Sequence, residues 1–406
     1  TFLDPCCGSG AYILALKNAQ PENIFGFDSD PVAVMLAKVN LLIKYADSDF
    51  LPKIFCRDYL LDKEESQYDY ISTNPPWGAF LTEMQKKESF SCFFKKAYSQ
   101  LKEGGRIRFL FPESVLNVKV HKDIREFLLK CCKLESITVY NNDFSGVATK
   151  YVNISTKKAE PGKTVIYKSG NRDEIVSTKA FELTENLTFN MLCDEDIAIL
   201  NKAKRIGKYN LSDSVWALGI VTGDNKNKLF AEPGVQREKI YTGREIERYR
   251  LKCAKNYIVY EPKNLQQTAK EEIYRATEKL VYKFISDRLV FAYDDSGALF
   301  LNSANMLIPK IPGMSVKTVM AFLNSELYSY FYRKLFGDVK VLKGNLINLP
   351  FARIDSSLNE KTDRLAERVI HELSDDAEEE LQSLIYQVFE MTESEIKHIK
   401  NELKRK

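Results

Sequence analysis

Residues Asn74 to Trp77 (NPPW) have the types and spacing to do chemistry, because two prolines stand between an amide and an indole. They directly follow the apolar run YDYIST at residues 68–73. Proline lacks the N–H that a sheet ladder needs, so a strand should end here in a rigid turn. The turn would present an amide oxygen and backbone carbonyls as fixed hydrogen-bond acceptors beside an aromatic face. Such acceptors can orient the hydrogens of an amine.

A second candidate site is the glycine loop DPCCGSG, residues 4–10, between an apolar run and a helical pattern. Glycines let a ligand approach the backbone, and a helix N-terminus offers free N–H groups. The next apolar run ends on Asp28, whose carboxylate can take both hydroxyls of a ribose. The following run ends on Asp58, which can accept from an adenine amine. Since the loop lacks the pattern GxGxxG, an adenosine-bearing ligand without pyrophosphate fits better than a dinucleotide.

Short apolar runs alternate with helical patterns over residues 1–155, which predicts an α/β fold with helices on both faces of a parallel sheet. Ligands bind at the carboxyl ends of the strands in such sheets, where all these features fall. Asp30, followed by Pro31, is interpreted as the N-cap of a helix. Residues 141–154 predict an antiparallel edge hairpin. We expect strands at 1–3, 23–28, 53–58, 68–73, 106–112 and 134–140, and helices at 11–19, 31–46, 89–105 and 121–132.

The order DPCCGSG, Asp28, RDY and NPPW resembles the gamma group of S-adenosylmethionine-dependent N6-adenine DNA methyltransferases. The segments KEGGRIRFLFPESVLN and FSGVATKYVNI resemble the next strand and late hairpin of that group. Downstream, LGIVTGDNKNKLF, YTGREIERY and LINLPF resemble the C-terminal domain of TaqI-like and Eco57I-like modification enzymes. The resemblance implies a Rossmann-like domain, with a mostly parallel seven-stranded sheet and an antiparallel edge hairpin. A mixed α/β DNA-recognition domain and a helical tail would follow it.

The resemblance also implies roles for these residues. S-adenosylmethionine would be the cofactor, and double-stranded DNA the substrate, with the target adenine flipped out of the duplex. Two acceptors on the N6 amine would localise its delocalised lone pair, and the prolines would hold them rigidly. The catalytic residues would be Asn74, Pro75, Pro76, Trp77 and Phe144, the last two stacking on the base. The cofactor-binding residues would be Asp4, Pro5, Cys6, Gly8, Gly10, Asp28, Ser29, Asp58 and Tyr59.

Recognition of DNA would fall to the second domain, whose polar and basic turns can reach bases and phosphates. The candidates are Asn225, Lys226, Lys228, Arg244, Lys340 and Lys343. The chain has 406 residues, which predicts two or three domains. We expect a catalytic domain at 1–170, a linker or peripheral strands at 171–190, a recognition domain at 191–352 and a helical segment at 353–406. Because the chain opens at Thr1 within a strand end, we expect the first part of the catalytic domain to be missing.

Bulk composition limits the other possibilities. The net charge is only +3, so any basic surface must be local. Eight cysteines show no CxxC spacing and there are three histidines, so we expect reduced thiols and no metal site. No run of about 18 apolar residues predicts a membrane span. We expect a cytoplasmic, nucleoid-associated monomer from a bacterium or archaeon, with a separate restriction endonuclease as a partner.

Several alternatives remain open from the sequence. An NPP-aromatic turn also serves methylation of protein glutamine, and a similar glycine loop serves guanine-N2 methylation of structured RNA. The chain could also be a fragment of a fused restriction endonuclease–methyltransferase, or a binding protein with an inactive methyltransferase core. The intact Asn74, Asp28 and Asp58 speak against the inactive form.

Overall fold

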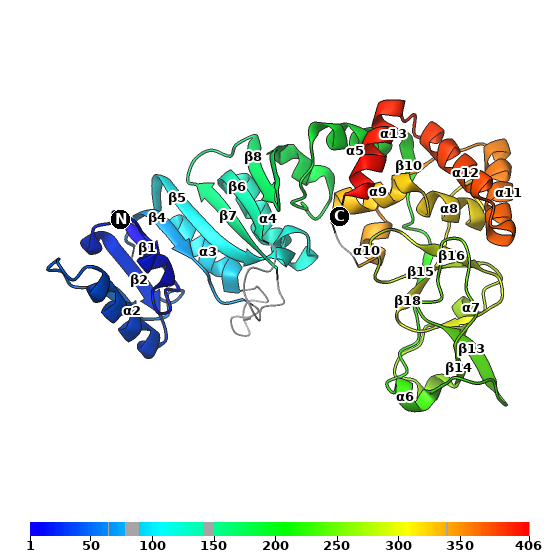
Figure 1. The fold of residues 1–406 in the computed structure, drawn as a ribbon, viewed down its shortest axis with the longest axis horizontal. Helices are drawn as coiled ribbons and strands as arrows, with labels where there is room; N and C mark the ends of the chain where they lie inside the picture. The colour runs from blue at the N-terminus through cyan, green and yellow to red at the C-terminus, as the bar shows by residue number, and fades with distance from the viewer. Residues whose placement is uncertain (64, 78–88, 141–149, 338–339, 406) are drawn as a thin grey trace. The chain divides into compact units, whose positions relative to one another are not determined.

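The computed structural model describes residues 1–63, 65–77, 89–140, 150–337 and 340–405. Its contacts divide the chain into two units, Thr1–Asp194 and Glu195–Lys406. In Figure 1 the first unit is a large sheet with helices against it, and the second combines small sheets with a group of helices.

The first unit is built on one nine-stranded sheet with the order β3-β2-β1-β4-β5-β7-β6-β8-β9. The first five strands in this order pair in parallel, so their carboxyl ends lie at one edge. The strands are β1 (Phe2–Asp4), β2 (Ile24–Asp28), β3 (Lys53–Cys56), β4 (Tyr68–Thr73), β5 (Leu101–Pro112), β6 (Lys133–Tyr140), β7 (Tyr151–Lys157), β8 (Thr164–Ser169) and β9 (Arg172–Ser177).

The α/β class and the mostly parallel sheet predicted from the sequence are confirmed, but two details of the sheet differ. It has nine strands rather than seven. Of the edge hairpin predicted at 141–154, residues 141–149 lie outside the described residues. Its last residues belong to β7, which is not at the edge, because it lies between β5 and β6 and pairs antiparallel with both. Most side chains of β7 are buried, as an interior strand requires. The hairpin of β8 and β9 forms the edge instead, and β9 falls in the predicted linker or peripheral strands at 171–190.

The helices of the first unit are α1 (Ala11–Leu14), α2 (Pro31–Lys44), α3 (Ser89–Ser99) and α4 (Lys122–Cys131). In α3, Phe90, Phe93, Phe94 and Ala97 are buried at the spacing of one helical face, which packs along β5. The first helix is shorter than the predicted 11–19. Its end is held by α2, because the Lys44 ammonium donates to three backbone carbonyls at the end of α1 and just beyond it.

The second unit contains three small sheets, ordered β11-β18-β15-β16, β12-β14-β13-β17 and β10-β19. The first two bury a common apolar cluster that includes Ile240, Val281 and Phe300. Their strands are β10 (Gly207–Tyr209), β11 (Val215–Leu218), β12 (Leu229–Phe230), β13 (Arg237–Tyr241), β14 (Asn256–Val259), β15 (Lys279–Lys283), β16 (Phe291–Asp294), β17 (Leu299–Phe300), β18 (Ala304–Ile308) and β19 (Phe351–Ala352).

The charged tail that begins at residue 353 is helical, as predicted, and forms the helices α11, α12 and α13. Of these, α11 packs along α8, and α12 and α13 pack along α9. The helices are α5 (Asp194–Ile206), α6 (Asn225–Lys228), α7 (Glu271–Tyr274), α8 (Val316–Leu323), α9 (Glu326–Phe336), α10 (Lys343–Leu346), α11 (Ser356–Glu372), α12 (Asp375–Val388) and α13 (Glu393–Lys404). Within the described ranges, no helix is long and apolar enough to cross a bilayer.

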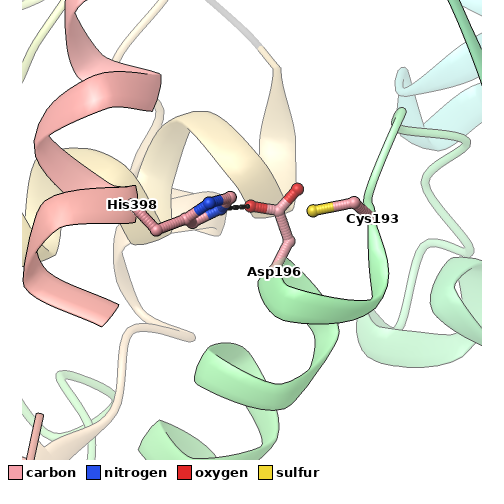
Figure 2. A group of neighbouring side chains, drawn as sticks. All are labelled: Cys193, Asp196 and His398. Carbon is pink, nitrogen blue, oxygen red and sulfur yellow. Dashed lines mark hydrogen bonds and ion pairs between the residues drawn. The ribbon is translucent and has the colours of Figure 1, made fainter. Parts of the chain in front are cut away.

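A buried ionic network joins α5, α9 and α13. Lys334 Nζ lies 2.7 Å from Asp196 Oδ2 and 2.7 Å from Glu402 Oε2. Figure 2 shows the His398 ring directed at the Asp196 carboxylate, with Nε2 2.8 Å from Oδ1. Burial raises the pKa of Asp196, but the Lys334 charge and the hydrogen bonds outweigh it and hold the pKa below its usual value. The network fixes the tail against the core of the second unit.

Candidate active site

The glycine loop connects β1 to α1 and is pinned to the end of β2. Gly8 and Gly10 have φ of 52° and 94°, a left-handed conformation that glycine adopts without strain. The Cys7 N–H donates to the Phe27 carbonyl at 2.9 Å, and the Gly8 N–H donates to Asp28 Oδ2 at 2.8 Å. A Cβ placed on Gly8 would meet nothing within 4 Å. The loop therefore has a fixed backbone with open space beside Gly8.

The Asp28 carboxylate stands at the end of β2, partly exposed. Its Oδ2 accepts from the glycine loop, and its Oδ1 accepts from the Asp30 N–H at 3.0 Å. Each oxygen keeps a further lone pair for a ligand hydroxyl. Ser29 beside it is exposed. Asp30 caps α2 by accepting from the Val32 N–H at 2.8 Å, with Pro31 at the first helical position, which confirms the interpretation of Asp30.

Asp58 and Tyr59 follow β3, and their side chains differ in exposure although both were predicted to bind the cofactor. Asp58 is exposed, and its Oδ1 accepts from the Leu60 N–H at 2.9 Å. Tyr59 instead is 2 % exposed, donates its hydroxyl to Gln100 and stacks on Phe93 at 5.8 Å. Tyr59 is therefore a core residue, and the proposed cofactor site does not retain it.

Asp4 ends β1 and is 1 % exposed. Its Oδ1 accepts from the Thr73 hydroxyl at 2.6 Å and from the Cys6 N–H at 3.1 Å. Its Oδ2 is buried without a hydrogen-bond partner among the described residues. Burial raises the pKa of Asp4 to about 7, against the hydrogen bonds from Thr73 and Cys6, and the charge of Asp28 raises it further. Pro5 after it is buried and Cys6 is partly buried. The buried Asp4 side chain thus links the end of β1 to the end of β4 and to the glycine loop.

The NPPW turn follows β4 and presents Asn74 to solvent. Asn74 and Pro76 are exposed, whereas Pro75 is buried. The Pro76 carbonyl accepts from the Ser89 hydroxyl at 2.6 Å. The Trp77 indole N–H donates to the Leu110 carbonyl of β5 at 3.3 Å, which fixes one edge of the half-buried ring. The proposed stacking residue Phe144 lies outside the described residues.

The four strand ends lie next to one another in the order β3, β2, β1, β4. Asp58, Asp28, the glycine loop and Asn74 are consequently on one edge of the sheet, as expected for a ligand site in an open α/β sheet. Sequence reasoning missed Thr73, which no motif marks. The available signal was its position as the last residue of β4, directly before Asn74.

The six candidate DNA contacts lie on the second unit and differ in the exposure of their side chains. Asn225, Lys226, Arg244, Lys340 and Lys343 are exposed. Lys228 is partly buried, and its ammonium donates to the carbonyls of Thr222, at 2.7 Å, and Asn264, at 2.5 Å. Lys228 therefore ties two loops together. Asp224 caps the short helix α6 that carries Lys226.

Two models of known families match parts of the chain. The model of the N-6 DNA methylase family matches residues 1–192, and that of the TaqI-like C-terminal specificity domain matches residues 238–351. The type II methyltransferase M.VspI of Vibrio sp. (strain 343) is 32 % identical over 270 residues, which cover 61 % of this chain and 65 % of the relative. The type II methyltransferase M.HincII of Haemophilus influenzae is 26 % identical over 174 residues, covering 37 % and 31 %. The chain thus spans less than two thirds of either relative.

Two solved structures share the fold at low identity. The type IIL restriction-modification enzyme MmeI, in complex with DNA, superposes with a TM-score of 0.66 at 13 % identity, covering 100 % of this chain and 73 % of that one. A nuclease-deletion mutant of the type ISP restriction-modification enzyme LlaGI, with a DNA substrate mimic, gives a TM-score of 0.60 at 11 % identity, covering 91 % and 51 %. These likenesses establish the fold.

Proposed function

We propose that the protein is a DNA methyltransferase of a restriction–modification system, because residues 1–192 match the N-6 DNA methylase model and residues 238–351 match that of the TaqI-like C-terminal specificity domain. We propose further that it transfers a methyl group from S-adenosylmethionine to N6 of adenine. The observation that carries the proposal is the common edge of β3, β2, β1 and β4, with an acid or amide at or just after each strand end.

The residues at this edge fit S-adenosylmethionine. Asp28 offers lone pairs to ribose hydroxyls, and exposed Asp58 offers an acceptor to the adenine amine. The space beside Gly8 allows a ligand to approach the loop backbone. Burial raises the pKa of Asp4 to about 7, so above that pH its carboxylate adds negative charge beside the loop, which suits a cationic ligand. When bound, S-adenosylmethionine supplies the electrophilic methyl group.

On the substrate side, the chain's own residues orient an amine. The Asn74 amide oxygen and the Pro75 carbonyl accept from the two hydrogens of the N6 amine, which directs its lone pair out of the ring plane. Pro75 is buried and the Pro76 carbonyl is held by Ser89, so the turn needs little reorganisation as charge develops on nitrogen. Trp77, held by its indole N–H, offers a face to the flipped base.

The specificity-domain match supports DNA as the substrate, ahead of structured RNA or protein glutamine. The relatives named as type II methyltransferases support a separate restriction endonuclease as cellular partner. We also propose that the protein acts as a monomer on nucleoid DNA in the cytoplasm.

The test measures which class of macromolecule receives the labelled methyl group. The purified protein is incubated with radiolabelled S-adenosylmethionine and, in parallel, with unmethylated genomic DNA, total RNA and a cell protein extract. We expect label in DNA alone. Label confined to RNA or protein would contradict the proposal, as would the absence of any transfer under conditions in which the cofactor binds.

A further inference from the structure

A side-chain hydrogen bond joins the two strand ends that carry the proposed cofactor loop and the proposed catalytic turn. The Thr73 hydroxyl donates to Asp4 Oδ1 at 2.6 Å. Asp4 is the last residue of β1 and Thr73 the last of β4, and Asn74 comes next along the chain. Both side chains are buried, at 1 % and 0 % exposure. A hydrogen bond to a carboxyl in such surroundings is shielded from competing water.

The backbone ladder between these strands stops short of this point. The last paired residues of β1 and β4 are Leu3 and Ile71, two residues before Thr73. On its other side β4 continues to pair with β5 up to Thr73 and Phe109. The end of β4 is therefore fixed by backbone bonds on the β5 side, and toward β1 by the Thr73–Asp4 bond.

The same oxygen of Asp4 also holds the glycine loop. Oδ1 accepts from the Cys6 N–H at 3.1 Å, so the loop and the end of β4 share one acceptor. A displacement of either strand end would be transmitted to the other through this atom. The charged and titratable groups near the Asp4 carboxyl are Asp28 from β2, Cys6 and Cys7 from the loop, and Tyr12 from α1.

We propose that Thr73 is a positioning residue, which sets the distance between Asn74 and the glycine loop by donating its hydroxyl to Asp4. Asn74 is exposed, so its alignment depends on the end of the strand that carries it. The role of Asn74 in methyl transfer rests on the proposed function, whereas the fixing of the NPPW turn by Thr73 does not.

The variant that tests this is Thr73→Val, which keeps the shape of the side chain and removes the hydroxyl. A misplacement of about 1 Å can cost about 100-fold in rate, so we expect kcat to fall about 10- to 100-fold. The KM for S-adenosylmethionine and the Kd for S-adenosylhomocysteine should stay within about threefold, since the Cys6 N–H bond to Asp4 and the Gly8 N–H bond to Asp28 still hold the glycine loop. Thr73→Ser, which restores the hydroxyl, should return kcat to within about threefold of wild type.

The matched control is Thr156→Val in β7 of the same sheet, because Thr156 is also 0 % exposed. It should leave kcat within about threefold. If Thr73→Val does not fold, Thr73→Ala removes the same hydroxyl and is held to the same criteria. Turnover of the Thr73 variant equal to that of wild type would overturn the proposal. A fall in kcat that Thr73→Ser does not reverse would do so too.

A second readout separates this inference from the proposed function. The chain has two tryptophans, so Trp216→Phe leaves Trp77, three residues from Asn74, as the only one. In that background, Thr73→Val should increase acrylamide quenching of Trp77, whereas Thr73→Ser and Thr156→Val should not. If the wild type transfers no label to DNA, the proposed function fails, and the quenching still decides whether Thr73 holds the turn. Unchanged quenching in Thr73→Val would refute it.

Discussion

The buried Asp4 predicts an unusual pH dependence of stability for the first unit. Its pKa is raised from 3.8 to about 7, chiefly because burial disfavours the charged carboxylate. Between these two values the folded state binds more protons than the unfolded state. Stability should therefore fall as the pH rises through this window, with the full cost present above about pH 7.

The size of the effect follows from the shift. At 1.36 kcal/mol for each pKa unit, the full window corresponds to about 4 kcal/mol, of which about 3 kcal/mol falls between pH 5 and pH 8. Asp4→Asn keeps the size of the side chain and an acceptor for Thr73 and Cys6, but it cannot ionise. The stability of the Asp4→Asn variant relative to wild type should therefore increase by about 3 kcal/mol from pH 5 to pH 8.

The assay is urea unfolding without cofactor at pH 5, 6, 7 and 8, followed by tryptophan fluorescence. Trp216→Phe is included in every variant, so that Trp77 reports the first unit alone. Asp47→Asn is the matched control, because it makes the same substitution at an exposed aspartate of the same unit. A constant difference between the Asp4→Asn and wild-type curves from pH 5 to pH 8 would refute the reasoning.

Two further predictions concern the second unit. Lys279 is 0 % exposed and forms an ion pair with buried Asp294. Lys279→Met leaves that carboxylate buried without its cation, so it should destabilise the unit by about 3–5 kcal/mol in urea unfolding followed at Trp216. A loss below about 1 kcal/mol would contradict this. Lys226 is exposed, so Lys226→Ala should weaken DNA binding and reduce the slope of log K against log salt by about 1. Lys228→Ala should leave that slope unchanged in the same titration, because the Lys228 ammonium already donates to two carbonyls.

The sequence was sufficient to predict which residues follow the strands of the parallel sheet. Asp28, Asp58 and Asn74 could be placed on one edge because each follows an apolar run, and parallel strands bring such ends together. The width of the sheet was not predictable in the same way. β8 and β9 lie in a polar, turn-rich stretch, and only their pairing with β6 and with each other makes them part of the sheet.

The direction in which each side chain points also could not be predicted from the sequence. Asp58 and Tyr59 are adjacent in the sequence, yet one faces solvent and the other is buried against Gln100 and Phe93, partners that lie far along the chain. The same holds for Thr73, whose role depends on Asp4, 69 residues away in sequence. Periodicity reports which positions are buried, whereas non-local contacts decide what each side chain touches.

The most direct test of the central claim is the chemical identity of the methylated nucleoside. DNA from a strain without adenine methylation is incubated with S-adenosylmethionine and either wild-type protein, Asn74→Ala or the control Asn23→Ala, an exposed asparagine of the same unit. The DNA is then digested to nucleosides and analysed by mass spectrometry. We expect N6-methyladenine with wild type and with Asn23→Ala, and a loss of at least about 100-fold with Asn74→Ala. Methylcytosine as the product, or N6-methyladenine at the wild-type rate from Asn74→Ala, would contradict the claim.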